Sequence, residues 1–216
     1  MKGYRPKRLP NHVGIIPDGN RRWAERNGLS REEGYLRGLD PGLQAFHICH
    51  DLGVREMTFY GFTRDNTKRP ASQKEAFRKA CVDAVYMLAG EDTELLVVGD
   101  HQSKQFPHEL KPFTKRTRFG KGGMKVNFLV NYSWEWDLSL NRAGTGKDGR
   151  WYASAEISRI DLIIRWGGRS RLSGFVPIQS VNADLFVVEE FWPDFHPLQI
   201  RQALEWYDQQ DVTLGG

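Results

Sequence analysis

The sequence predicts a single α/β domain built on a mainly parallel, six-stranded sheet flanked by helices. Six short apolar runs, several of them rich in β-branched residues, lack strict alternation, as expected for strands that are covered on both faces. Helical patterns separate most of these runs, which is typical of a parallel sheet. The chain of 216 residues contains no internal repeat or low-complexity tract, so one hydrophobic core is expected.

The predicted elements alternate along almost the whole chain. Strands are expected at residues 12–16, 57–62, 94–98, 125–130, 161–166 and 185–188. Helices are expected at residues 21–26, 43–52, 72–88, 107–115 and 197–207. The stretch 139–150 is rich in Gly, Asn and Asp, which predicts an exposed loop.

Composition excludes several classes of protein. With 39% apolar and 27% charged residues, the chain is neither disordered nor collagen-like. No apolar run approaches the roughly 20 residues that span a bilayer, and the first residues lack the apolar core of a signal peptide. The 2 cysteines show no paired spacing, which suits a reducing compartment, and we expect a cytoplasmic protein. Residues 1–11 are interpreted as a flexible basic arm and residues 12–216 as one domain.

The segment after the first predicted strand has the features of an anion site. Asp18 and Gly19 lead directly into a helix, whose first backbone N–H groups and positive end favour a phosphate. A carboxylate beside a phosphate repels it unless a cation lies between them, and Mg²⁺ is the usual cation. The alternative is that Asp18 only caps the helix.

Two further strand ends are rich in hydrogen-bond donors. After the fifth predicted strand, the pair Gly167-Gly168 lies among arginines and serines that suit phosphate oxygens. The segment 63–70 follows the second strand and contains Arg69, which is either a ligand-binding or a surface residue. Because ligands bind at the carboxyl ends of parallel strands, we expect these loops to form one site.

Other chemistries have less support. The sequence contains no Walker A motif, no G-x-G-x-x-G motif and no metal-type spacing of Cys and His. His47 and His50 are interpreted as a surface pair on a helix. A nucleic-acid-binding domain is a rival, given 7 Trp and a net charge of +4. The arginines, however, lie beside glycine turns, which suits compact diphosphates better, so no nucleic-acid partner is expected.

These motifs resemble those of the cis-prenyltransferase family, of the undecaprenyl diphosphate synthase type. Residues 12–23 resemble its first motif and residues 161–175 its last. Between and after them, the order of the family is kept by Tyr60-Gly61-Phe62, Asn66, Arg69-Pro70, Gly99-Asp100, Asn131-Tyr132 and Trp192-Pro193-Asp194-Phe195. The resemblance covers nearly the whole chain.

The resemblance implies a homodimer with the cis-prenyltransferase fold that joins isopentenyl diphosphate to an allylic diphosphate, forming a cis double bond. Asp18 would place Mg²⁺ on the diphosphates, and Asp184 stands where the family commonly has a glutamate that reaches the metal at the dimer interface. Asn66 matches an asparagine implicated in proton removal. The implied substrate-binding residues are Gly19, Asn20, Arg21, Arg22, Trp23, Arg31, Tyr35, Arg69, Arg165, Arg171 and Ser173, the last three for isopentenyl diphosphate.

Some residues differ from the common family pattern. Tyr35 replaces a frequent His, Thr67 a frequent Trp and Arg169 a frequent Glu. Two intervening stretches are shorter than in long-chain synthases, which predicts a short or medium product. The helix 72–88 is either one wall of a product tunnel or plain core.

Two alternative functions remain open at this point. One is irregular head-to-middle coupling, because the first motif is also similar to that of the small lavandulyl-type branch. The other is a catalytically silent subunit of a prenyltransferase heteromer. In the favoured reading, contact with a membrane is at most peripheral and occurs through a lipid product.

Overall fold

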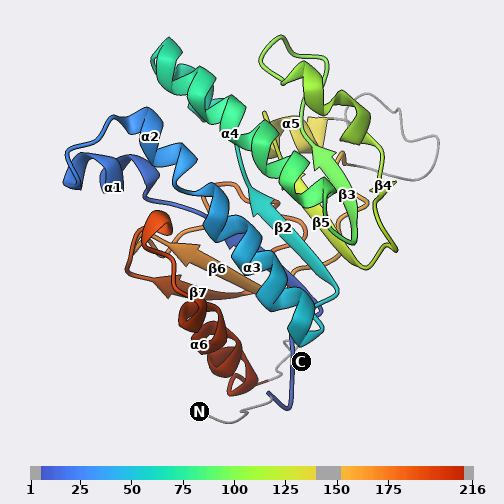
Figure 1. Cartoon of the computed structure of the whole chain (residues 1–216). Coiled ribbons are helices and arrows are strands. Elements are labelled where there is room, and N and C mark those ends of the chain that lie inside the picture. The colour runs from blue at the N-terminus through green and yellow to red at the C-terminus, as the bar shows by residue number, and fades with distance from the viewer. Residues whose placement is uncertain (1–5, 140–151, 212–216) are drawn as a thin grey trace.

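The computed structural model describes residues 6–139 and 152–211, in which seven strands form one sheet (Figure 1). The strands are β1 (His12–Ile16), β2 (Glu56–Tyr60), β3 (Thr93–Val98), β4 (Thr117–Arg118), β5 (Met124–Leu129), β6 (Leu162–Trp166) and β7 (Asp184–Val188). All six predicted strands are present. The predicted loop 139–150 lies outside the described residues except for Ser139, which ends a helix.

The strand order is β4-β3-β5-β2-β1-β6-β7, and the pairings among the six predicted strands are all parallel. The additional strand β4 has two residues and runs antiparallel to β3 at one edge. The expected number of six strands is therefore one too low. Two residues carry no detectable hydrophobic alternation, so this strand exists only because the folded chain returns along β3.

The α-helices of the described residues are α1 (Asn20–Arg26), α2 (Arg31–Leu36), α3 (Leu39–Leu52), α4 (Ala71–Ala89), α5 (Trp134–Ser139) and α6 (Pro197–Asp208). Short 3₁₀-helices also occur at η1 (Arg64–Lys68), η2 (His108–Thr114) and η4 (Trp192–Asp194). The predicted helix 107–115 is η2, because Pro112 inside it has no N–H to donate. The sequence does not predict α2 and α5, whose 6 residues each are too few to show a period.

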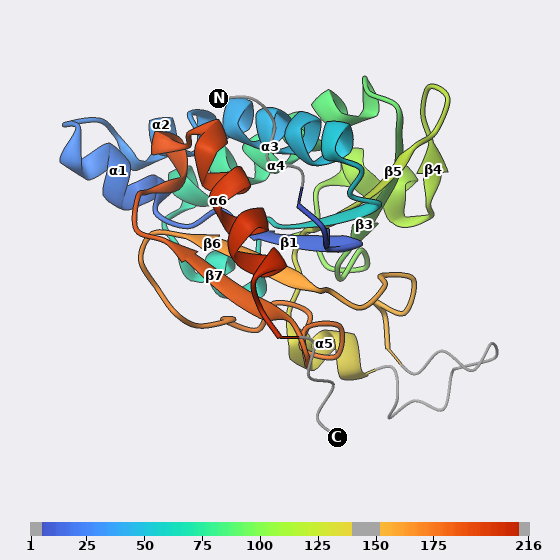
Figure 2. The same ribbon diagram turned by 90° about the horizontal axis from the view of Figure 1, so that it is seen from below.

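The sheet lies between two layers (Figure 2). Helices α3, α4 and α6 pack on one face, over the larger hydrophobic core that includes Ile15 and Met57. Helix α5 and the loops on either side of β6 cover the other face, over a smaller cluster that includes Ile163 and Phe175. Every residue of β1 and β6 is buried, which explains why these strands lack alternation.

The described part of the predicted basic arm packs against α6. The backbone N–H of Arg8 donates to Asp208 Oδ1 at 2.7 Å, and the Arg8 guanidinium lies 4.1 Å from the centre of the Tyr207 ring. Residues 1–5 lie outside the described residues, and the domain boundary at residue 12 stays a prediction. Within residues 6–139 and 152–211, no helix is both long enough and apolar enough to cross a membrane.

A buried histidine lies at the amino-terminal end of the sheet. His12 is fully buried; its Nε2 is 2.8 Å from Thr58 Oγ1, and its Nδ1 is 3.1 Å from the backbone oxygen of Ser158. Burial lowers the pKa of His12 from its ordinary value of 6.5, although Glu56 and Asp161 nearby favour its protonation. His12 is therefore neutral in the folded chain at neutral pH.

This burial predicts that the protein loses stability in mild acid. The unfolded chain binds a proton at His12 near pH 6.5, where the folded chain does not. The contribution of neutral His12 to the free energy of unfolding is complete above pH 6.5. As the pH falls from there toward the pKa of His12 in the folded chain, this contribution decreases by up to about 1.4 kcal/mol per pH unit. His12→Asn should flatten the curve of unfolding free energy against pH below about pH 6.5, measured by urea denaturation. His108→Asn, at an exposed position, should keep the wild-type dependence of unfolding free energy on pH. If the two variants gave the same dependence, His12 would not be the group responsible for the loss of stability in acid.

Candidate active site

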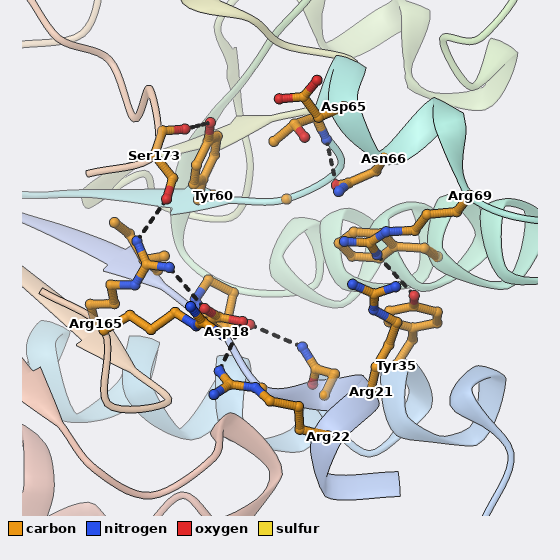
Figure 3. A pocket seen from close by; sticks show the side chains of 18 of the residues that line it. Asp18, Arg21, Arg22, Tyr35, Tyr60, Asp65, Asn66, Arg69, Arg165 and Ser173 are labelled. Carbon is orange, nitrogen blue, oxygen red and sulfur yellow. Dashed lines mark hydrogen bonds and ion pairs between the residues drawn. The ribbon is translucent and has the colours of Figure 1, made fainter. Parts of the chain in front are cut away.

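The loops that follow β1, β2 and β6 line a cleft of about 520 Å³ at the carboxyl ends of these strands (Figure 3). Strands β2 and β6 flank β1 on opposite sides, and crevices form where the order of parallel strands diverges in this way. The predicted site residues that line the cleft are Asp18, Gly19, Asn20, Arg21, Arg22, Tyr35, Asn66, Arg69, Arg165, Arg171 and Ser173. Most of the predicted side chains therefore share one cleft.

Asp18 lies in the turn between β1 and α1. Gly19 permits the turn, because its φ is +105° and a Cβ there would lie 2.7 Å from Phe191 Cδ1. Gly19 is also the N-cap of α1, and no side-chain hydrogen bond caps this helix. The alternative that Asp18 serves as the helix cap is therefore wrong. Its carboxylate points into the cleft instead (Figure 3).

Two arginines pair with the Asp18 carboxylate. Arg165 Nη2 donates to Asp18 Oδ2 at 2.8 Å, and Arg22 Nη2 lies 3.4 Å from Asp18 Oδ1. The Arg165 side chain is only 4% exposed, whereas that of Asp18 is 32% exposed. A buried guanidinium requires such a partner, since an unpaired charge in the interior is costly. The ion pair joins the loop after β1 to strand β6.

The loop after β6 turns at two glycines and folds back over Arg165. Gly167 and Gly168 have φ values of +85° and +66°, and a Cβ at Gly167 would lie 2.5 Å from Arg22 Nη2. Arg165 Nη1 donates to Ser173 Oγ at 3.0 Å and also to the backbone oxygen of Arg171. The Arg171 side chain is exposed in the cleft. Guanidinium and hydroxyl donors thus line this side of the cleft, as phosphate recognition requires.

The opposite wall combines a cation with stacked aromatic rings. Arg69 Nη1 donates to Tyr35 Oη at 2.8 Å, and its guanidinium carbon lies 5.3 Å from the centre of the Phe77 ring. The Tyr35 and Phe77 rings stack with centres 4.6 Å apart. Burial lowers the pKa of Arg69, but an arginine remains cationic at neutral pH. Asn66 Oδ1 accepts a hydrogen bond from the Thr63 backbone N–H at 2.9 Å, which fixes this amide at the start of η1.

The residues of the cleft fit a magnesium ion that arrives with a diphosphate. Asp18 and Asp65 are the carboxylates among the residues that line it. In the part of the chain that the structure describes, no group of three or more His, Cys, Asp or Glu side chains could hold a metal alone. Mg²⁺ usually binds one or two carboxylates and completes its shell with water and phosphate oxygens. The partly exposed Asp18 carboxylate is suited to that role.

Three predicted residues do not line the cleft. Trp23 Nε1 donates to Asp194 Oδ1 at 2.7 Å, and Arg31 pairs with Glu25 at 2.5 Å, so both side chains are turned away. Asp184 is the first residue of β7 and pairs in register with Leu162, at the amino-terminal end of β6. It therefore lies at the opposite end of the sheet from Asp18 and could reach a shared metal only from a second chain.

Several lining residues are absent from the predicted set. They are Ile16, Pro17, Tyr60, Gly61, Thr63, Asp65, Phe77 and Arg169. Asp65 lies in the donor-rich segment 63–70 that follows the predicted strand 57–62. Tyr60 was expected inside that strand, but β2 ends at Tyr60, which places this residue at the mouth of the cleft. Phe77 belongs to the helix 72–88, for which a tunnel wall and plain core were both expected, and its place in the lining agrees with the first of these.

Comparison with known proteins agrees with this architecture. Residues 16–215 match the family model described as "Putative undecaprenyl diphosphate synthase". The chain is 28% identical to a ditrans,polycis-undecaprenyl-diphosphate synthase of Haemophilus ducreyi, over 99% of this chain and 97% of that one. It is 30% identical to an isoprenyl transferase of Ralstonia nicotianae, over 95% of this chain and 87% of that one.

A solved structure shares the fold. Lavandulyl diphosphate synthase from Lavandula x intermedia, in complex with dimethylallyl diphosphate, superposes with a TM-score of 0.83 at 21% identity, covering 96% of this chain and 99% of that one. At this identity the likeness concerns the fold. Together with the family match, it shows that the chain belongs to the cis-prenyltransferase family and is an enzyme that transfers prenyl groups.

Proposed function

We propose that this enzyme joins isopentenyl diphosphate to an allylic diphosphate with Mg²⁺, forming a cis-prenyl diphosphate of short to medium length. The observation that carries the proposal is the 2.8 Å ion pair between Asp18 and Arg165. It brings the two predicted diphosphate-binding loops to one cleft, where two substrates can react. Loops that faced different clefts would have left the proposal without support.

The two diphosphates would bind on either side of Asp18. On one side Arg69, Arg21 and Arg22, with the backbone from Gly19, would hold the allylic diphosphate. On the other side, Arg165, Arg171 and Ser173 would hold isopentenyl diphosphate. Contacts within the protein orient Arg165, Ser173 and Arg69, so little reorganisation is needed when negative charge develops on the departing diphosphate.

Asp18 would hold the magnesium ion, which supplies Lewis-acid stabilisation of the diphosphate charge when bound. Asn66 is proposed to take part in removing the proton from isopentenyl diphosphate. Its side chain is already oriented by the hydrogen bond from the Thr63 backbone. No covalent nucleophile is required for this reaction, which agrees with the polar, arginine-rich lining.

The apolar space beside the cleft supports a short or medium product. Two small apolar cavities of about 60 Å³ each lie between α3 and α4, against Phe128 and Trp192. Ala80, Ala84 and other residues of α4 line them, so this helix is both core and cavity wall. Such volumes are small for the tail of a long polyprenyl chain.

Incubation of the intact chain with Mg²⁺, isopentenyl diphosphate and labelled dimethylallyl, geranyl or farnesyl diphosphate tests the function directly. We expect an elongated product, whose length mass spectrometry would give and whose cis geometry and head-to-tail linkage NMR would verify. A head-to-middle skeleton would establish irregular coupling instead. Failure of every primer, despite binding of isopentenyl diphosphate, would indicate a silent subunit.

We further propose a cytoplasmic homodimer. Cys49 and Cys81 are buried free thiols, which suits a reducing compartment. Strand β7 ends the sheet, and Val181 before it is 65% exposed, so this edge is available to a second copy. Sedimentation should give the mass of two chains, and Val181→Lys should shift it toward one. A monomeric wild-type enzyme with full activity would exclude a metal contact from the partner chain.

A further inference from the structure

Tyr60 ends β2 and lines the cleft beside the loop that follows β6 (Figure 3). Its hydroxyl donates to the backbone oxygen of Ser173 at 2.7 Å. Burial raises the pKa of Tyr60 well above its ordinary value of 10, so the hydroxyl stays protonated and remains a donor. One hydrogen bond thus connects β2 to the loop that carries Arg171 and Ser173.

The backbone at Ser173 is in a conformation that side chains disfavour. Its φ is +52°, and Gly174 and Val176 follow with φ values of +80° and +24°. A positive φ costs free energy in a residue other than glycine, so it persists only where surrounding contacts hold it. Gly174 is also confined, since a Cβ there would lie 3.0 Å from Trp134 Cδ1.

Contacts on both sides of Ser173 hold the rest of this segment. Arg165 Nη1 donates to the backbone oxygen of Arg171, and the Phe175 backbone N–H donates to the Leu172 oxygen at 3.0 Å, which closes the turn that contains Ser173. Phe175 is fully buried, and its ring centre lies 5.2 Å from that of Tyr60. Gly14 makes room for it, because a Cβ at that position would lie 2.6 Å from Phe175 Cε1. Ser180 Oγ donates to the Phe175 backbone oxygen at 3.1 Å. At Ser173 itself, the backbone oxygen accepts the hydrogen bond from the Tyr60 hydroxyl.

The conformation of Ser173 matters to the cleft because its hydroxyl contacts Arg165. Ser173 Oγ accepts from Arg165 Nη1 at 3.0 Å, while the other terminal nitrogen of Arg165 binds Asp18. A Ser173 that relaxed to negative φ would move its hydroxyl away from the guanidinium. The donors on this side of the cleft would then lose their common orientation.

We propose that Tyr60 is a positioning residue, whose hydroxyl holds Ser173 in its left-handed conformation and so keeps the Arg165–Ser173 side of the cleft ready for a diphosphate. The inference deepens the proposed function and rests on it. It assigns Tyr60 no contact with the reacting atoms. Its effect reaches the substrate through the Ser173 carbonyl.

Tyr60→Phe tests the inference by removing only the hydroxyl. Calorimetric titration of the intact chain with isopentenyl diphosphate, without an allylic primer, should show binding weakened by about threefold to tenfold, as loss of one hydrogen bond predicts. In steady-state assays the KM for isopentenyl diphosphate should rise by the same factor, with kcat within about twofold. Tyr86→Phe, which removes an exposed tyrosine hydroxyl on α4, should leave both values unchanged.

A glycine at position 173 separates positioning from direct contact. Ser173→Gly should itself weaken binding, because the hydroxyl on Arg165 is lost. Glycine adopts positive φ without strain, so Tyr60→Phe should then have an effect of less than about twofold in the Ser173→Gly background. If the Tyr60 hydroxyl contacts the ligand directly, its loss should weaken binding equally in both backgrounds.

The outcomes separate this inference from the proposed function. Wild-type protein that binds no isopentenyl diphosphate would overturn both. Wild-type binding that Tyr60→Phe leaves unchanged would overturn the role of Tyr60 alone, as would equal effects in the serine and glycine backgrounds. Weaker binding confined to the serine background would support the positioning role.

Discussion

Asp18→Asn should lower kcat/KM for both diphosphate substrates by at least about a thousandfold, because several kcal/mol of transition-state stabilisation depend on this carboxylate. The amide keeps the shape of the side chain and can still accept a hydrogen bond from Arg165. It removes the negative charge that would hold Mg²⁺ between the diphosphates. Steady-state kinetics with saturating Mg²⁺ measures the loss.

The fold should survive this change. Asp18 is 32% exposed and the amide keeps an oxygen for Arg165, so the ion pair loses its charge but not its hydrogen bond, and the thermal unfolding temperature should fall by roughly 2–8 °C. Asp83→Asn is the matched control, since Asp83 lies on α4 and pairs only with Lys79 among the ion pairs of the described residues. It should retain wild-type kinetics. Activity of Asp18→Asn within tenfold of wild type would refute the metal-binding role.

Arg165→Met should have the second largest effect, lowering kcat/KM for isopentenyl diphosphate by roughly a hundredfold to a few thousandfold. A charge-assisted hydrogen bond from this guanidinium to a phosphate would contribute about 1.5–3 kcal/mol, and loss of the side chain also removes the group that orients Asp18 and Ser173. Asp18 would lose its 2.8 Å partner, and Ser173 Oγ its 3.0 Å donor. Kinetics with each substrate varied in turn would show effects on both diphosphates.

Arg171→Ala provides the comparison. Arg171 is exposed, and its guanidinium forms no ion pair with Asp18 among the described contacts. Its loss should therefore raise the KM for isopentenyl diphosphate by about tenfold or more, as expected for one charge-assisted contact, and spare the allylic substrate. If Arg165→Met behaves no differently from Arg171→Ala, the ion pair with Asp18 does not couple the two halves of the cleft.

The two main loops of the site were predictable because their chemistry is local. Asp18 follows a buried strand and precedes a helix, while Arg165 ends another strand before two glycines. Parallel strands deliver their carboxyl ends to one edge, so position behind a strand is enough to gather such residues. Tyr60 and Asp65 lie in segments that the sequence also marks, the motif Tyr60-Gly61-Phe62 and the donor-rich stretch 63–70, but neither pattern shows that their side chains enter the cleft.

Trp23 and Arg31 show the limit of that reasoning. Trp23 lies in α1 and Arg31 begins α2, yet each side chain has a polar partner that turns it away from the cleft. Asp194, 171 residues away, accepts the indole N–H of Trp23, and Glu25 pairs with Arg31. Nearness in sequence to a strand end therefore does not determine which side chains enter the cleft.

The amino-acid sequence by itself determined the six parallel strands, the loops that follow them and the kinds of donor that these loops carry, since each depends on residues that are neighbours in the chain. Only the tertiary structure decided that β4 joins the sheet, that Asp184 lies far from Asp18, and that Tyr60 contacts the carbonyl of Ser173, 113 residues away. Those features depend on how distant segments meet and which way their side chains point. Packing of the whole chain determines which distant segments meet and where their side chains point, and no pattern of neighbouring residues predicts either.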